Sequence, residues 1–392
     1  SDEIIIGVVA AIGSGASSVS KILSDILIKD YGYTGKIIKA SDKIEQNGFR
    51  VSDNVDLSQP NRVERLQQIG SALRGKFGAD YVINKCVEEI NSSRPNVDPA
   101  APPRRHFTII DSIKNPVEQV RLADIYGGAF WQVGVFAPEG QRERRLKSQY
   151  KAEQIARMFE IDQDEGKKYG QKVKSAISKS DYFIRNDSNS FEDLRESVKR
   201  FIDLLFRTNV ITPSIDEVGM YAAASASMGS ACLSRQVGAA IVDSLGNVIA
   251  EGRNDVPKAH GGLYGRDSNN DQRCFRVHGG VCHNDMHKSN IINNLTADIQ
   301  SELSINGDSL DKLKKIISNS GIKSLIEFSR SVHAEMDAIL SAARSGVGSQ
   351  LQGSSLYSTV YPCHNCARHI VAAGVSRVVY IEPYTKSLAL DL

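Results

Sequence analysis

The sequence predicts an α/β protein of two domains. Its 392 residues exceed the usual size of a single domain. Over residues 1–207, apolar strand-like runs alternate with helix-like stretches, which indicates a mostly parallel sheet covered by helices. Residues 208–215 are a plausible linker, and residues 216–392 then show a helix, a hairpin and further strands. We therefore expect one domain on each side of this linker.

The composition is that of an ordinary globular protein. The formal charge of +2 gives no global argument for nucleic-acid binding. No apolar run approaches the ~20 residues needed to span a bilayer, and no N-terminal signal is visible. Two or more of the six cysteines fit metal ligation better than disulfides, which favours a reducing cytoplasm. We expect a cytoplasmic protein without a membrane segment. Because the chain begins inside a strand-like run, we also expect a trimmed copy.

A glycine-containing loop follows the first predicted strand, residues 3–9, and precedes a helix-like stretch that ends near residue 27. Strand, glycine loop and helix are the P-loop arrangement. Compared with G-x-x-x-x-G-K-[ST], Ala10 replaces the first glycine and Ala16 replaces the lysine, whereas Gly15 and Ser17 match. Without that lysine we predict a nucleotide-binding or regulatory relic rather than an active kinase. The predicted phosphate-binding residues are Gly13, Ser14, Gly15, Ala16 and Ser17.

The rest of this half adds strands and charged residues in a kinase-like order. Asp111 ends an apolar strand that begins at residue 106, where it would suit a Mg²⁺ ligand; the alternative is a simple helix cap. A strand at 131–136 precedes Arg142, Arg144 and Arg145, which fit an arginine lid or a solvated helix. Residues 1–207 resemble the P-loop nucleoside and nucleotide kinases. The resemblance implies a bound nucleotide with Mg²⁺.

The strongest signal lies near the C-terminal end, where His333 and Glu335 precede Cys363 and Cys366 by about thirty residues. Two thiolates and a neutral imidazole suit Zn²⁺ and leave a fourth coordination position for water. Cys363 and Cys366 would share the first turn of a helix, and His333 and Glu335 the first turn of another. Glu335 would then carry protons without binding the metal. The alternative is a structural zinc site or a thiol pair, but a second Cys-x-x-Cys is absent from the sequence.

Two β-rich runs, 230–242 and 247–252, predict a hairpin, and residues 355–361 and 377–381 are later strands. Ser230, Cys232, Arg235, Asn254 and the zinc set follow the order seen in deoxycytidylate deaminases, which residues 216–384 resemble. The resemblance implies a cytidine deaminase-like α/β/α sandwich. It also implies that Asn254 binds the sugar or base edge and that Ser230 and Arg235 lie near the nucleotide. A turn residue and an exposed charge are the alternatives for Asn254 and Arg235.

A long polar insertion, 261–329, separates the Asn254 turn from His333. Three of the eight histidines and two of the six cysteines fall within fourteen of its residues. A second, structural zinc and a loop with surface histidines are both consistent with this pattern. Cys232 and His260 are further candidate ligands. The predicted ligands within the insertion are Cys274, His278, Cys282, His283 and His287.

The fusion of a P-loop half without its lysine to a deaminase half resembles the bacterial two-domain anti-phage dCTP/dCMP deaminases. This resemblance covers essentially the whole chain. It implies conversion of dCTP, dCMP or both to deoxyuridine nucleotides, which would deplete the dCTP needed by a phage. It also implies a homo-oligomer, commonly a hexamer, and a small inhibitory RNA as partner. The alternatives are a tRNA- or single-stranded-DNA-editing deaminase and a nucleotide-sensing regulatory protein.

Overall fold

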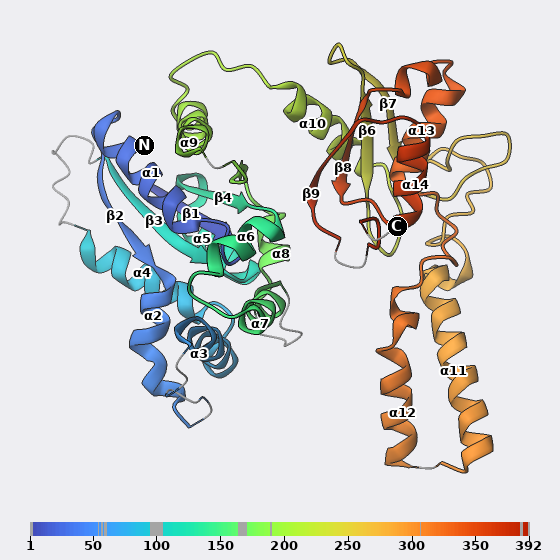
Figure 1. The fold of residues 1–392 in the computed structure, drawn as a ribbon, viewed down its shortest axis with the longest axis horizontal. Helices are drawn as coiled ribbons and strands as arrows, with labels where there is room; N and C mark the ends of the chain where they lie inside the picture. Colours follow the sequence, from blue (N-terminus) through green and yellow to red (C-terminus); the bar gives the residue numbers. More distant parts are fainter. Residues whose placement is uncertain are drawn as a thin grey trace. The chain divides into compact units, whose positions relative to one another are not determined.

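The chain forms two compact units, Ser1–Ile211 and Thr212–Leu392, in a computed structural model (Figure 1). The structure describes residues 3–53, 55, 58, 61–94, 105–163, 171–188, 190–305, 307–384 and 387–390. Within these residues, none of the helices combines the length and apolar character that crossing a membrane requires. The predicted boundaries 1–207, 208–215 and 216–392 stay a prediction.

The N-terminal unit is built on a five-stranded parallel sheet with the strand order β2-β3-β1-β4-β5. Its strands are β1 (Glu3–Ala10), β2 (Thr34–Lys39), β3 (His106–Ile113), β4 (Phe130–Phe136) and β5 (Tyr182–Arg185). Its α-helices are α1 (Ala16–Lys29), α2 (Ala40–Asn47), α3 (Arg62–Phe77), α4 (Tyr81–Ser93), α5 (Pro116–Tyr126), α6 (Glu139–Leu146), α7 (Ala152–Gln163), α8 (Val173–Ile177) and α9 (Phe191–Phe206).

The β1 sequence explains why helices cover both faces of this sheet. Ile4, Ile6 and Val8 belong to a buried cluster with α1 and α9. Ile5 and Val9 belong to a second cluster that includes residues of α2, α3 and α4. Side chains alternate between the two faces of a strand, so an uninterrupted apolar run buries both.

The connections leaving β1 and β3 run to opposite sides of the sheet. The chain passes from β1 to the outer strand β2, and later from β3 across β1 to β4. Ligands of open parallel sheets bind outside the carboxyl ends of the strands at such a reversal. The loop after β1 and the residues after β3 meet at this edge (Figure 1).

The C-terminal unit is a helix-covered sheet with the order β7-β6-β8-β9, in which only the β8–β9 pair is parallel. Its strands are β6 (Gly238–Val242), β7 (Val248–Arg253), β8 (Ser355–Val360) and β9 (Arg377–Glu382). Its α-helices are α10 (Ile215–Ser227), α11 (His283–Leu303), α12 (Asp308–Ser318), α13 (Ala334–Arg344) and α14 (His364–Ala372). Ala239 and Ile241 of β6 pack with α13 and α14, whereas Ala240 and Val242 pack with α10. The result is the predicted α/β/α sandwich.

Two sequence predictions differ from the structure in this unit. The predicted strand at 230–242 is confined to Gly238–Val242, because side-chain hydrogen bonds hold residues 230–237 as a loop. The polar insertion is not simply a loop. It contains α11 and α12, which run side by side as a long helical hairpin (Figure 1).

Candidate active site

The side chains of His333, Cys363 and Cys366 converge in the C-terminal unit. Their candidate ligand atoms all lie within 4.8 Å of one another. His333 Nδ1 is 3.3 Å from Cys363 Sγ and 3.4 Å from Cys366 Sγ. Both cysteines are buried, whereas His333 is partly exposed. The two sulfur ligands are therefore shielded from solvent, while the imidazole lies on the side of the site that solvent reaches.

Two helix starts hold these ligands. His333 is the N-cap of α13, and Cys363 is the N-cap of α14. The amide of Cys366 donates a hydrogen bond to Cys363 Sγ at 3.5 Å, so the thiol replaces the usual serine or aspartate cap. The positive end of each helix dipole lies at the site and stabilises negative charge on sulfur. Helix geometry thus aims one imidazole and two thiols at a common point.

Glu335 occupies the first turn of α13 and is 4% exposed. Its Oε2 lies 3.5 Å from Cys366 Sγ. Desolvation raises the pKa of the Glu335 carboxyl above its ordinary value. A carboxyl group with a raised pKa next to a metal-ligand set is suited to accept and return a proton.

Hydrogen bonding couples the two thiols. The hydrogen bond from Cys366 lowers the pKa of Cys363 to about 4, and a contact with His333 acts in the same direction. The pKa of Cys366 is raised, first by that shared hydrogen bond and then by burial. The hydrogen bond to Cys363 also raises the pKa of His333. The shared hydrogen bond therefore favours negative charge on Cys363 over Cys366.

The donor set and its spacing fit zinc. Zinc prefers tetrahedral sulfur and nitrogen ligands, and bond lengths of about 2.3 Å and 2.0 Å separate those ligand atoms by about 3.5 Å. The observed nitrogen–sulfur distances of 3.3 and 3.4 Å are close to that value. With three protein ligands the fourth position of a tetrahedral ion stays available.

Residues 214–382 match the family model described as the cytidine and deoxycytidylate deaminase zinc-binding region. The C-terminal unit carries a deaminase domain of this family. The triad of His333, Cys363 and Cys366 and the neighbouring Glu335 all lie inside the matched residues.

Comparisons with individual proteins give one curated relative and two solved structures that are similar to parts of the chain. Deoxycytidylate deaminase of Enterobacteria phage T2 is 45% identical over 56 residues, which cover 14% of this chain and 29% of the phage enzyme. A crystal structure of dCMP deaminase from the cyanophage S-TIM5 is 22% identical, covers 46% of this chain and 93% of that one, and has a TM-score of 0.26. The APS kinase of Mycobacterium tuberculosis is 14% identical, covers 52% and 98%, and has a TM-score of 0.30. The chain thus spans less than a third of the phage T2 enzyme that it matches.

Asn254 of the deaminase domain has an internal structural role. Its Oδ1 accepts hydrogen bonds from the Val237 amide at 2.7 Å and from Ser230 Oγ at 3.0 Å. Its Nδ2 donates to the Arg235 carbonyl at 2.7 Å. These bonds shape the 230–237 loop and occupy the amide that the resemblance assigns to a nucleotide. Arg235 pairs with Glu382 at 3.1 Å and remains 40% exposed. A nucleotide-binding role of Ser230, Arg235 and Asn254 stays a prediction.

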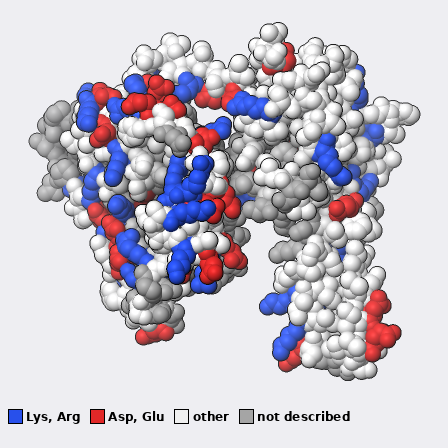
Figure 2. Space-filling view, in the orientation of Figure 1, with Lys and Arg blue, Asp and Glu red and all other residues white. Residues whose placement is uncertain are grey.

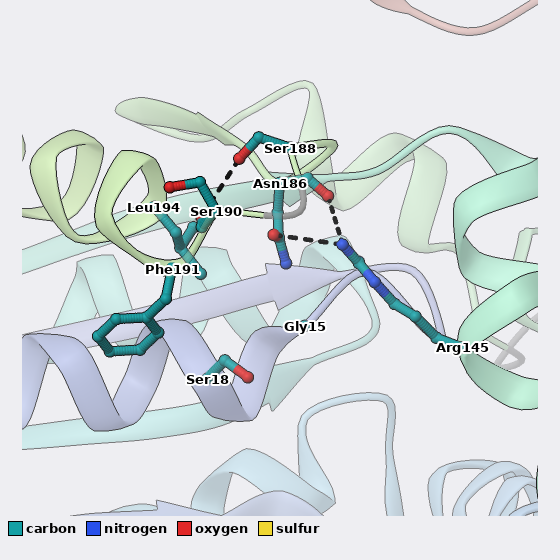
Figure 3. Close-up of a pocket in the computed structure, with 8 residues that line it drawn as sticks. All are labelled: Gly15, Ser18, Arg145, Asn186, Ser188, Ser190, Phe191 and Leu194. Atoms are coloured by element: carbon teal, nitrogen blue, oxygen red, sulfur yellow. Dashed lines mark hydrogen bonds between the residues drawn. The ribbon is translucent and has the colours of Figure 1, made fainter.

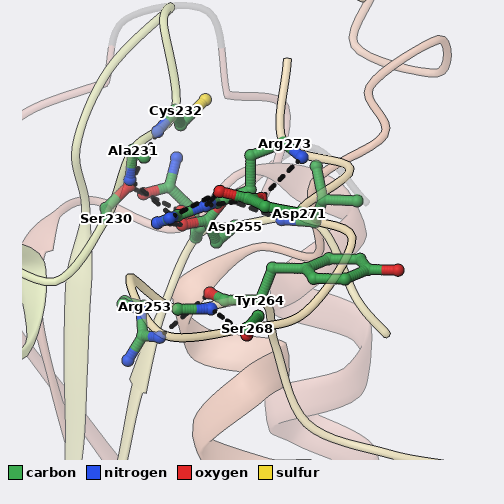
Figure 4. Close-up of polar contacts among 12 residues, drawn as sticks. Ser230, Ala231, Cys232, Arg253, Asp255, Tyr264, Ser268, Asp271 and Arg273 are labelled. Atoms are coloured by element: carbon green, nitrogen blue, oxygen red, sulfur yellow. Dashed lines mark hydrogen bonds and ion pairs between the residues drawn. The ribbon is translucent and has the colours of Figure 1, made fainter. Parts of the chain in front are cut away.

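A buried ion pair that the sequence analysis missed supports the same loop (Figure 4). Asp255 is 1% exposed, and its carboxylate accepts hydrogen bonds from the amides of Ala231 and Val256 at 3.0 and 2.9 Å. Arg273 of the insertion lies 3.7 Å from the same carboxylate and 2.8 Å from Asp271. The Asp255 carbonyl accepts from the amide of Val332, the residue before His333. The only sequence feature that pointed to this ion pair was the position of Asp255 directly after Asn254.

Close packing places β7 against the helix that carries Glu335. A Cβ atom at Gly252 would overlap the backbone of α13 at Ala334 and Ala338. Asp337 of α13 accepts a hydrogen bond from the amide of Arg253 at 3.1 Å. The residues just before Asn254 therefore contact the first turns of α13 directly, through this close packing and this hydrogen bond.

The predicted second zinc site lacks a converging set of ligands in the described part. There, groups of three or more candidate ligands occur only at His333, Cys363 and Cys366. His283 and His287 do lie on one side of α11, with ring centroids 4.5 Å apart, but His287 stacks on Phe328. The side chain of His278 lies outside the described residues. Cys274 and Cys282 join no group of three with the described histidines, so the second zinc remains a prediction.

The N-terminal unit brings several predicted P-loop residues together. Ser17 Oγ donates to Asp111 Oδ2 at 2.7 Å, which joins the end of the loop to the Mg²⁺-ligand candidate. Gly13 and Gly15 have positive φ angles of 79° and 94°, which favour glycine. Arg145 donates to the Gly13 carbonyl at 3.1 Å. A pocket of about 320 Å³ lies beside this loop. Figure 3 shows its lining residues, which are Gly15, Ser18, Arg145, Asn186, Ser188, Ser190, Phe191 and Leu194.

Proposed function

We propose that the protein hydrolyses the exocyclic amino group of deoxycytidine nucleotides. Water replaces the amino group at C4, and the products are a deoxyuridine nucleotide and ammonia. The observation that carries this proposal is the convergence of His333, Cys363 and Cys366 beside the buried Glu335 in a deaminase-family domain.

The chain's residues divide the chemistry between them. His333, Cys363 and Cys366 would hold Zn²⁺, which when bound lowers the pKa of a water molecule. Glu335 would take a proton from the attacking water, pass it to the ring nitrogen beside C4, and assist the departure of the amino group as ammonia. The raised pKa of Glu335 favours retention of the proton between these transfers. The buried sulfur atoms and the surrounding apolar cluster exclude bulk water.

The family description supports deoxycytidine nucleotides as the substrate class, and the phage T2 relative is named a deoxycytidylate deaminase. We propose dCMP, dCTP or both. A polynucleotide would need a basic track for its backbone. In Figure 2, Lys and Arg alternate with Asp and Glu over the visible face of the N-terminal unit. The formal charge of +2 likewise gives no global argument for nucleic-acid binding.

Incubation of the purified protein with dCMP, dCTP, CMP and single-stranded DNA tests the substrate class. We expect a mass increase of about 1 Da on the deoxycytidine nucleotides, together with ammonia release that a zinc chelator abolishes. Heat-denatured protein supplies the blank. Turnover of the polynucleotide alone would contradict the proposal and favour an editing enzyme.

The remaining biological predictions follow from the resemblance to two-domain anti-phage deaminases. We propose that dCTP loss limits phage replication, that the chain forms a homo-oligomer such as a hexamer, and that a small RNA restrains it. The thiol ligands require reducing conditions, which agrees with a cytoplasmic location. We also propose that the N-terminal unit binds a nucleotide with Mg²⁺. Nucleotide pools measured during phage infection, with wild-type protein and Glu335→Gln in parallel, test the defence role.

A further inference from the structure

The glycine loop of the N-terminal unit lacks the lysine that its motif normally supplies. Ala16 stands at the lysine position of the motif. The Ser14 hydroxyl is 1% exposed and has no hydrogen-bond partner among the described residues. The loop ends at Ser17, which contacts Asp111. A buried, unpartnered hydroxyl within a glycine loop indicates that a ligand completes the site.

A lysine that directly follows strand β3 contacts this loop. Lys114 follows β3, and its Nζ donates a hydrogen bond to the carbonyl of Ala10, the first residue of the loop motif, at 2.9 Å. Its backbone is held firmly, since its amide donates to Glu118 Oε2 at 2.9 Å and its carbonyl accepts from the Lys172 amide. Glu118 is itself buried and paired with Arg74 at 2.7 Å. The ammonium group is therefore positioned on the loop by a rigid support.

An internal carboxylate already contacts both the loop and this ammonium. Asp162 of α7 is 1% exposed, and its Oδ1 accepts from Lys114 Nζ at 2.7 Å. Its Oδ2 accepts from the amide of Ile12, within the loop, at 2.6 Å. Backbone amides of such loops and a lysine ammonium are the groups that bind phosphate oxygens. Asp162 thus makes the contacts expected of a phosphate group.

We propose that Lys114 supplies the ammonium missing at Ala16 and that Asp162 occupies the anion position until a phosphate replaces it. The ligand class is a nucleoside polyphosphate with Mg²⁺. Ser17 and Asp111 lie together where a P-loop holds the metal ion. The cavity beside Gly15 offers an aromatic ring, Phe191, and a guanidinium, Arg145, for the nucleoside (Figure 3). This inference concerns the N-terminal unit and does not depend on deamination.

Calorimetric titration of the full chain with Mg·ATP and with Mg·pyrophosphate tests the proposal. Lys114→Met should weaken Mg·ATP binding by at least about tenfold, because a charge-assisted hydrogen bond is lost. Asp162→Asn should tighten it, since the competing negative charge is removed. Ala16→Lys in the Lys114→Met background should restore binding. Lys85→Met is the matched control, since Lys85 pairs on the surface with Glu88 of the same helix.

The outcomes separate this proposal from misfolding and from the deaminase proposal. Trp131, the single tryptophan of the sequence, lies in β4. Its fluorescence therefore reports whether the N-terminal unit of each variant is folded. ATP carries no cytosine, so its binding is independent of the reaction at Glu335. Equal affinity of folded wild type and Lys114→Met for Mg·ATP would overturn the role of Lys114. Equal or weaker binding by Asp162→Asn would overturn the role of Asp162, and failure of every variant to bind would overturn the site.

Discussion

Replacement of Arg273 by methionine removes the buried contact between the insertion and the zinc-site loop, together with the pairing of Arg273 with Asp271 inside the insertion. Methionine keeps much of the apolar stem but removes the charge. Asp255 would then stay buried with its two amide hydrogen bonds from Ala231 and Val256 as partners. The Asp255 backbone also holds Val332, so the effect should reach His333. We therefore expect weaker folding of the deaminase domain and weaker retention of zinc.

The distance sets the size of the effect. At the observed 3.7 Å and an effective dielectric constant of about 20, the Coulomb energy is about 4.5 kcal/mol. The desolvation cost of Arg273 disappears in the variant, and the two amide bonds to Asp255 remain. We therefore expect the free energy of unfolding to fall by about 2–3 kcal/mol. Loss of one partner of a buried ion pair typically costs about 3–5 kcal/mol, and the two remaining amide hydrogen bonds reduce this cost.

Urea unfolding measures the loss in each unit separately. Release of zinc to a colorimetric chelator would report the deaminase domain, while Trp131 fluorescence would report the N-terminal unit in the same sample. Arg276→Met is the matched control, because Arg276 lies in the same loop, 4.0 Å from Asp271, with a side chain 65% exposed. Asp255→Asn and the double variant complete a cycle that gives the coupling energy. Equal zinc-release midpoints for Arg273→Met and Arg276→Met would refute the argument.

Three further predictions concern the deaminase domain. Glu335→Gln should retain zinc, measured by metal analysis, but lose ammonia release by at least about a hundredfold because proton transfer is lost; retained activity would exclude the shuttle. Gly252→Ala should cost about 3 kcal/mol through overlap with α13, and an unchanged zinc-release midpoint in urea would contradict that contact. Burial and the hydrogen bond to Asp216 raise the pKa of Tyr357 to about 12. Because the folded state then holds its proton longer than the unfolded state, stability should fall between about pH 10 and 12 by up to ~1.4 kcal/mol per pH unit, and Tyr357→Phe should remove that slope.

Local patterns in the sequence predicted much of the fold. The apolar run of β1, the glycine loop and the helix that follows this loop are each defined by neighbours in sequence, and the structure contains them. The hairpin of β6 and β7 was likewise predicted from its turn. The triad was also a local signal, because a helix start sets the spacing of Cys363 and Cys366.

The missed features depend on partners distant in the sequence. Lys114 contacts Ala10 from 104 residues away, far outside the span of the P-loop motif. Arg273 reaches Asp255 from within an insertion whose path could not be predicted. The role given to Asn254 came from resemblance alone, whereas its amide satisfies the backbone of residues 235 and 237. A polar side chain in a loop can serve the backbone or a ligand, and composition does not separate the two.

The precision of the zinc ligands comes from the way two helix starts are fixed to one sheet. Cys363 and His333 are N-caps, so each helix start sets the backbone position of one ligand, and the Cys363 side chain also accepts a hydrogen bond from the amide of Cys366. Helix α13 cannot shift away from β7 without losing the close approach at Gly252 and the Asp337 bond to the Arg253 amide. The chain before α13 is held in turn by Asp255, whose carboxylate depends on the insertion through Arg273. The insertion is therefore part of the support of the triad, because two consecutive contacts, Arg273 with Asp255 and Asp255 with Val332, connect it to the residue before His333.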